Sequence, residues 1–217
     1  MIAQIVLYEG FDPLDVIAPF EVLNAGSDAL GGIIDVRLVG LDAPGPVTSG
    51  TGGLQLKAKH VLMPEAPGVV IVPGASGPVH GDPDTERIIP VILAGLAETA
   101  LPSLMRRAFA APDTIVATVC GGGLALAMAG LLEGRTAVTH TMGNDVLEAT
   151  GTTVVRARVV DDGDLVTAGG VTSGLDLALY LLERMHGPRI AHAVEELFEY
   201  ERRGTVWSAR GPVPLPA

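Results

Sequence analysis

The stretch TIVATVCGGG, from Thr114 to Gly123, decides the fold of this chain. Its first six residues, up to Val119, are uncharged and mostly apolar, which predicts a buried strand. A helix of small and apolar residues is predicted to follow, from Leu124 to Leu132. The single cysteine, Cys120, is therefore expected at a sharp turn between a buried strand and a helix.

The same alternation of strands and helices extends in both directions from this stretch. Further strands are predicted over Ile2–Tyr8, Ile33–Val39, Gly68–Val72, Thr153–Val160 and Leu165–Ala168. A helix is predicted from Asp12 to about Leu23, with its end at Asn24 and Gly26. Residues 84–109 also have helical spacing, with breaks at Pro90 and Pro102. Further helices are predicted over Asn144–Ala149, Ser173–Met185 and 189–200. This order predicts an α/β fold of flavodoxin type: a doubly wound, mostly parallel sheet with helices on both faces.

The remaining segments contain turn-forming residues. Residues 44–53 are rich in Gly, Pro, Ser and Thr and predict a loop or a small hairpin. Residues 73–77, PGASG, predict a sharp turn at the end of a strand, and residues 211–217 predict an extended tail. Neither a linker nor an internal repeat divides the chain, so we expect one domain over 1–217, with about 201–217 as its C-terminal tail.

The composition indicates that much of this chain is buried. Hydrophobic residues make up 48% of the 217 residues and charged residues only 18%, below the usual charged share of about a quarter. A parallel sheet covered on both faces accounts for this excess, and a subunit interface would add to it. We therefore expect a homodimer.

Charge and cysteine content limit the possible partners and locations. A net charge of −11 disfavours binding to nucleic acid and to anionic membranes. One cysteine cannot form an internal disulfide, which suits a reducing compartment. The first residues lack the basic region of a signal peptide, and no apolar stretch is long enough to span a bilayer. We expect a cytoplasmic protein with no nucleic-acid or membrane partner.

Cys120 is the first candidate for chemistry. A strand-to-helix turn lifts a side chain out of the sheet, as the nucleophile elbow of serine hydrolases does. The helix N-terminus favours a thiolate, and the three glycines allow a substrate to approach the backbone. The alternatives are a cysteine that only packs in the core, or a glycine-rich turn that holds a phosphate. The turn lacks the lysine of a P-loop and the spacing of a dinucleotide site.

Two further groups are candidates for assisting Cys120. Asp15 lies among apolar residues in the first turn of a helix, where burial would raise its pKa and suit it to proton transfer. The alternative is a carboxylate that only complements the helix dipole. Backbone N–H groups at Gly74, Ala75 and Gly121 could converge on a developing negative charge. Glycine at 121 is expected to permit a positive φ.

His140 follows a short strand-like segment, and it is either a general base or a packed, hydrogen-bonded histidine. Ser76 is not part of a G-x-S-x-G motif, so a serine hydrolase is disfavoured. No H-E-x-x-H, C-x-x-C or clustered histidine and aspartate pattern predicts a metal, and no cofactor is expected.

These motifs together resemble the ThiJ/PfpI superfamily, of class I glutamine amidotransferase-like fold. The resemblance runs from Ile2 to about Glu199 and includes Leu14-Asp15-x-x-x-Pro19-x-Glu21-Val22-Leu23, Val72-Pro73-Gly74, Val119-Cys120, Gly130-Leu131-Leu132-x-Gly134, Ala137-x-Thr139-His140 and Gly169-Gly170-Val171-Thr172-Ser173-Gly174-x-Asp176. The motif around Asp15 is similar to the isonitrile hydratase branch, in which an aspartate partners a nucleophilic cysteine.

The resemblance implies a cysteine-dependent hydratase or lyase that adds water to a small electrophilic carbon, with isonitrile to N-formamide as the leading candidate. It implies Cys120 as nucleophile, Asp15 as its partner, backbone donors at Ala75 and Gly121, and substrate contacts at Gly74 and His140. Isonitrile hydratases carry threonine after the cysteine, where this chain has glycine. The alternatives are hydration of a glyoxal-type aldehyde and a redox or small-molecule sensor based on oxidation of the cysteine.

Overall fold

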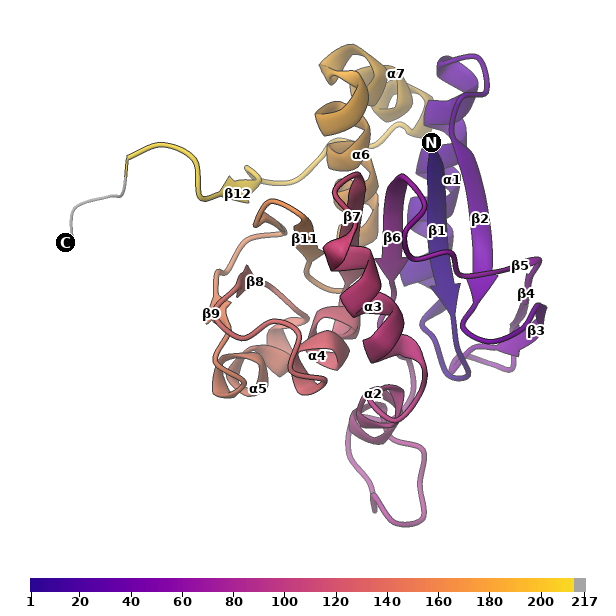
Figure 1. Ribbon diagram of the computed structural model, residues 1–217, viewed down its shortest axis with the longest axis vertical. Coiled ribbons are helices and arrows are strands. Elements are labelled where there is room, and N and C mark those ends of the chain that lie inside the picture. The colour runs from indigo at the N-terminus through magenta and orange to yellow at the C-terminus, as the bar shows by residue number, and fades with distance from the viewer. Residues whose placement is uncertain (213–217) are drawn as a thin grey trace.

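A computed structural model describes residues 1–212 of the chain, and an eight-stranded sheet runs through its centre (Figure 1). The strands, in their order across the sheet, are β12 (Trp207–Ser208), β10 (Val159–Asp161), β11 (Leu165–Ala168), β7 (Thr114–Val119), β6 (Gly68–Val72), β1 (Ile2–Leu7), β2 (Asp35–Gly40) and β5 (His60–Val61). All neighbouring pairs are parallel except β10 and β11. The inner order β2-β1-β6-β7-β11 is the flavodoxin order, which confirms the predicted fold class.

Helices cover both faces of this sheet. The helices are α1 (Pro13–Ala29), α2 (Ile89–Leu96), α3 (Leu101–Ala110), α4 (Gly121–Met128), α5 (Asn144–Ala149), α6 (Ser173–His186) and α7 (Pro188–Phe198), with a 3₁₀ turn, η1 (Thr141–Gly143). Helices α1, α6 and α7 contact one another, whereas α3 and α4 both pack against β7. In Figure 1, α3 lies in front of the sheet and α1 and α6 lie behind it. Within residues 1–212 no single helix is long and apolar enough to cross a membrane. The bent pair of α2 and α3 together has the length and the apolar composition of a span, and these are the only two properties compared.

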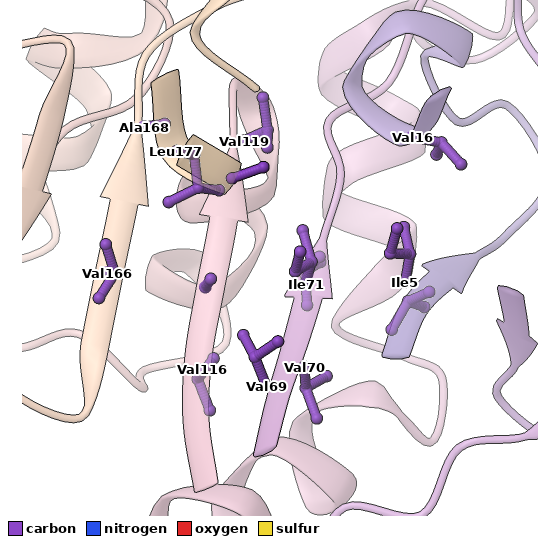
Figure 2. Close-up of a cluster of buried hydrophobic side chains, with 14 of the residues drawn as sticks. Ile5, Val16, Val69, Val70, Ile71, Val116, Val119, Val166, Ala168 and Leu177 are labelled. Atoms are coloured by element: carbon purple, nitrogen blue, oxygen red, sulfur yellow. The ribbon is translucent and has the colours of Figure 1, made fainter. Parts of the chain in front are cut away.

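The core follows the central strands. Figure 2 shows side chains such as Ile5, Val70, Ile71, Val116 and Val166 along β1, β6, β7 and β11, and all five are fully buried. Because both faces of a parallel sheet are covered, such strands are continuous apolar runs rather than alternating ones. Each buried aliphatic side chain contributes about 1.5–3 kcal/mol to folding.

Several predicted elements agree with the structure. The segment over 84–109 divides into α2 and α3, each with a proline in its first turn. The turn-rich segment around 44–53 belongs to a hairpin of β3 (Gly45–Thr48) and β4 (Gln55–Ala58). Part of the predicted C-terminal tail, residues 213–217, lies outside the described residues.

The predicted end of the first helix at Asn24 and Gly26 is wrong, because α1 continues to Ala29. Gly26 serves packing instead of ending the helix. A Cβ atom on Gly26 would lie 2.4 Å from Cδ2 and 2.6 Å from Cδ1 of Leu182 in α6. The missing side chain therefore lets α6 pack closely against α1.

Two other predicted boundaries are also wrong. The helix predicted from Leu124 begins earlier, at Gly121, and ends at Met128, before Gly130 with its φ of +71°. The strand predicted over Thr153–Val160 is divided in two. Its first part, β9 (Thr153–Val154), pairs with β8 (Thr136–Ala137), and its last residues enter the main sheet as β10.

We predict that Gly26→Ala destabilises the protein by about 1–3 kcal/mol, the usual range for overpacking a core. Because the new methyl group would overlap Leu182, the melting temperature should fall by several degrees. Gly95→Ala is the matched control, since a Cβ atom on this exposed glycine of α2 would meet no atom within 4 Å. That variant should gain up to about 1 kcal/mol from helix propensity. Equal melting temperatures for the two variants would contradict this account of α1.

Candidate active site

Cys120 occupies a strained turn between β7 and α4. Its φ of 54° and ψ of −127° are unfavourable for any residue with a side chain and cost about 1–3 kcal/mol. Both backbone groups of Cys120 are held in place. Its N–H donates to the carbonyls of Ala168 (3.0 Å) and Gly169 (3.1 Å), and its carbonyl accepts a hydrogen bond of 2.6 Å from Oγ1 of Thr139. These contacts offset the strain and keep the cysteine in one conformation.

The glycines after Cys120 are required by packing rather than by a positive φ. The expectation of a positive φ at Gly121 is wrong, because Gly121 is the first residue of α4 and the positive φ belongs to Cys120. A Cβ atom on Gly122 would lie 2.1 Å from the carbonyl oxygen of Val72, so α4 can begin against the end of β6 only with glycine there. A Cβ atom on Gly121 would lie 2.8 Å from Cδ1 of Leu93.

Asp15 lies fully buried at the start of α1, beside the elbow. Its Oδ2 accepts a hydrogen bond of 2.9 Å from the backbone N–H of Gly74, and its buried Oδ1 has no partner among the described residues. Burial, followed by the negative charge of Asp12, raises the pKa of Asp15 to about 8, against the opposing effect of the Gly74 hydrogen bond. Asp15 therefore carries a proton at neutral pH, as a proton-transfer group requires.

Burial also raises the pKa of the Cys120 thiol. Burial, and next the charge of Asp15, raise the pKa of Cys120 well above its ordinary value, while the N–H of Gly121 lowers it by less. The expected thiolate at the helix N-terminus is therefore wrong for the resting protein, because desolvation outweighs the helix. The pair rests as a thiol beside a carboxylic acid.

The topology of the sheet brings this pair together. Asp15 follows β1 and Gly74 follows β6, and these two strands are neighbours whose connections leave in opposite directions. Such a switch point opens a crevice at the carboxyl ends of the strands. Cys120 ends the next strand, β7. A Cβ atom on Gly74 would lie 2.8 Å from Oδ2 of Asp15 and 3.0 Å from Cβ of Cys120, so only glycine fits between them.

A cavity of about 390 Å³ opens above Cys120. Its walls are mostly apolar and include Leu93, Leu124, Met128, Met142, Val146 and Val171. Cys120, Gly121, Ala75 and His140 also line it, whereas Asp15 does not. Among the described residues, the N–H of Ala75 has no acceptor, so it is free to donate to a bound group. The cavity suits a small apolar molecule that meets a few polar groups at the sulfur.

His140 lines the cavity together with Cys120. Its Nδ1 accepts a hydrogen bond of 3.2 Å from the N–H of Met142 and so caps η1. A Cβ atom on Gly170 would lie 2.1 Å from Cδ2 of His140 and 3.2 Å from Sγ of Cys120. The imidazole edge and the sulfur therefore face the same small space, which glycine at 170 leaves open.

Comparison with known proteins agrees with this geometry. Residues 94–184 match the DJ-1/PfpI family. Isonitrile hydratase from Pseudomonas putida is 36% identical over 199 residues, which cover 90% of this chain and 76% of that protein. The chain belongs to the DJ-1/PfpI family.

Solved structures of the DJ-1/PfpI family share the fold. A THiJ/PfpI family protein from Pseudomonas syringae superposes with a TM-score of 0.76 at 25% identity, covering 94% of this chain and 76% of that one. DJ-1beta from Drosophila melanogaster gives a TM-score of 0.73 at 19% identity, covering 92% and 98%. These matches confirm the resemblance inferred from the motifs.

Sequence reasoning missed three residues of this DJ-1/PfpI site. Thr139 and Leu93 contact the elbow, and the hydroxyl of buried Tyr8 donates to the carbonyl of Pro73 at 3.0 Å. Burial, and next the charge of Asp15, raise the pKa of Tyr8. Of these three residues only Thr139 belongs to a motif quoted from the sequence, and that motif does not indicate that its hydroxyl donates to the carbonyl of Cys120. Within residues 1–212 no cluster of three or more metal-binding side chains occurs.

We predict that Asp15→Asn stabilises this DJ-1/PfpI protein increasingly as the pH rises. The pKa of Asp15 rises from 3.8 to about 8 on folding, so between these values the folded state keeps a proton that the unfolded state releases. The contribution of this carboxyl to the free energy of unfolding is fully present below the pKa of the unfolded chain. Above that pKa it falls by about 1.4 kcal/mol per pH unit until the pKa of the folded protein is reached. Asparagine has no such dependence and can still accept from Gly74.

Melting temperatures measured from about pH 4 to 8 test this linkage. The difference between the variant and the wild type should widen steadily with pH. Asp28→Asn, at the exposed end of the same helix, should show no widening. Parallel curves for Asp15→Asn and the wild type would mean that the buried carboxyl ionises normally.

Proposed function

We propose that this protein is a hydro-lyase that adds water to the carbon of an isonitrile and releases an N-substituted formamide. The 36% identity to isonitrile hydratase from Pseudomonas putida, over 90% of this chain, carries the proposal. The buried pair of Asp15 and Cys120 supports it, because hydration of an isonitrile needs both a nucleophile and a proton for the same carbon.

The reaction proceeds in two steps on Cys120. In the first, the sulfur forms a bond to the isonitrile carbon and that carbon receives one proton, which gives a thioimidate, R–N=CH–S–Cys120. The shared protons of Asp15 and Cys120 supply it, because both groups rest protonated. In the second step water adds to the carbon, the C–S bond breaks, the sulfur regains its proton and R–NH–CHO leaves.

The cavity suits a substrate whose substituent is uncharged and apolar. Its lining is mostly aliphatic and methionine side chains, which favours an apolar substituent, and Asp12 is the acidic residue among them. In this proposal two N–H groups stabilise the negative charge that develops during attack: that of Ala75, which has no acceptor among the described residues, and that of Gly121, which hydrogen-bonds the Cys120 sulfur. Threonine at 121, as in isonitrile hydratases, would have to displace Leu93, so this chain holds its substrate with a differently shaped wall.

We predict that Cys120→Ala abolishes isonitrile turnover, because it removes the sulfur that would bond to the isonitrile carbon. Asp15→Asn should lose about a hundredfold or more, the usual scale for a proton-transfer group. Loss of the isonitrile stretch in the infrared and the appearance of formamide by NMR measure the rate. Asp28→Asn, from the same helix but exposed, should turn over at the wild-type rate.

Full activity in Cys120→Ala would overturn the mechanism. A wild-type protein that leaves isonitriles untouched but consumes a glyoxal would replace the substrate assignment with aldehyde hydration. Consumption of neither, together with ready oxidation of Cys120, would favour the sensor function.

We also propose that the protein is a homodimer, since several large apolar side chains are exposed on the single chain. Met142 is 61% exposed, Ile33 54% and Leu197 70%. A partner subunit would bury part of this surface. Sedimentation at micromolar concentration should give twice the chain mass, and a species of 22.3 kDa alone would refute the dimer.

A further inference from the structure

We infer that the hairpin of β3 and β4 positions the backbone N–H of Ala75 for the reaction, through Gly50 and Thr51 in the loop that joins its two strands. In the proposed function this N–H stabilises negative charge during attack, and the inference rests on that function. Ala75 lies in the turn after β6, outside the helices and strands, so neighbouring segments have to hold its donor in place. Gly50 and Thr51 are positioning residues, which act through this turn.

The pairing of Ala75 sets the direction of its N–H. Ala75 lies opposite Phe11 in an isolated antiparallel bridge. Two backbone hydrogen bonds flank this pair: from the N–H of Asp12 to the carbonyl of Gly74 (2.8 Å) and from the N–H of Ser76 to the carbonyl of Gly10 (3.1 Å). In a pair of this kind, the backbone groups of the two opposed residues point away from each other. The N–H of Ala75 therefore points away from Phe11, and Ala75 lines the cavity.

The hairpin holds the segment opposite Ala75 from its other side. The N–H of Gly50 donates to the carbonyl of Phe11 at 3.0 Å, and the N–H of Gly10 donates to the carbonyl of Thr48 at 2.8 Å. The hairpin lies beside the carboxyl end of β1 (Figure 1), so the segment after β1 is enclosed between the hairpin and the turn. No described residue of the hairpin lines the cavity. The hairpin therefore acts on the reaction through the segments that it holds.

The hairpin also contacts the turn directly, at Ser76. A Cβ atom on Gly50 would lie 1.8 Å from the carbonyl oxygen of Ser76 and 2.8 Å from its Oγ. Gly50 has no positive φ, so close approach rather than conformational freedom requires glycine there. Beside it, Oγ1 of Thr51 donates a hydrogen bond of 2.9 Å to Oγ of Ser76. Because Ser76 follows Ala75 directly, a displacement of the Ser76 backbone also displaces the donor of Ala75.

Substitutions in the hairpin measure this positioning. Gly50→Ala forces the hairpin and the turn apart, and we expect kcat for cyclohexyl isonitrile to fall by about ten- to a hundredfold, the scale of a misplaced or lost donor. KM should change by less than about twofold, because the donor acts in the transition state. Gly45→Ala is the matched control in the same hairpin, since a Cβ atom there would meet no atom within 4 Å, and it should keep the wild-type kcat.

Thr51 offers a milder pair of variants that leaves the glycine intact. Thr51→Val removes the hydroxyl that donates to Ser76, and kcat should fall by about fivefold, the scale of one hydrogen bond. Thr51→Ser keeps this hydroxyl and should restore the wild-type kcat. Melting curves check that each variant is folded.

Two reagents for Cys120 give a readout that a general loss of structure would not produce. In acylation by p-nitrophenyl acetate, the sulfur bonds to the carbonyl carbon through an oxyanion, and p-nitrophenolate leaves with release of the thiol proton. In alkylation by iodoacetamide, the sulfur displaces iodide with release of the same proton and no oxyanion forms. Gly50→Ala and Thr51→Val should slow acylation by factors similar to those for kcat and leave alkylation unchanged. Intact mass follows both reactions, and Cys120→Ala gives the background.

The inference is overturned if Gly50→Ala and Thr51→Val keep the wild-type ratio of acylation to alkylation, which includes the case in which both reactions slow equally. Should Gly50→Ala not fold, the comparison of Thr51→Val with Thr51→Ser decides by the same ratio. A wild-type protein that leaves isonitriles untouched, with variants that still lower the ratio, would overturn the proposed function and support the role of the hairpin. Isonitrile turnover in the wild type with an unchanged ratio in the variants would do the reverse.

Discussion

The strained backbone of Cys120 is the constraint on which the rest of the site depends. A φ of 54° is tolerated only because the surroundings hold both backbone groups of the residue, through the carbonyls of Ala168 and Gly169 and the hydroxyl of Thr139. These partners come from β11, from the residue after it, and from the segment before η1. The elbow therefore assembles only when strands far apart in the sequence have already paired.

The same turn forces α4 against the end of β6, and this contact explains the glycines. Gly122 faces the carbonyl of Val72, and Gly74 separates Asp15 from Cys120. Neither glycine has a positive φ, so close approach rather than conformational freedom selects them. The carboxyl and the thiol are thus held together by backbone packing, and burial raises the pKa of both groups because it denies them solvent.

Two buried groups that rest protonated are costly for stability and useful for chemistry. A free thiolate would already be charged before substrate arrives, whereas in the proposed reaction this pair keeps its protons until a carbon receives one. The cavity above the sulfur is lined mostly by apolar side chains. His140 lines the same cavity, and its Nδ1 accepts a hydrogen bond from the N–H of Met142.

The sequence by itself determined the order of strands and helices and the position of Cys120 at a turn, but it left open whether Asp15 is buried or only complements the helix dipole. Apolar runs, prolines and glycines are local signals, and the flavodoxin order follows from them because parallel strands require helical crossovers. The predictions from local signals were wrong for two glycines: Gly26 was expected to end a helix, and Gly121 was expected to permit a positive φ. Only the tertiary structure showed that Leu182 and Leu93 occupy the space that these glycines leave open.

The tertiary structure alone also decided the protonation of the elbow and the partners of Thr139 and His140. The sequence placed a helix N-terminus beside the cysteine and so favoured a thiolate. Desolvation and the charge of Asp15, which depend on the packing of α1 against β6 and β7, reversed that expectation. Burial and pairing across the chain are properties of the folded whole, because they arise from groups that distant segments bring together.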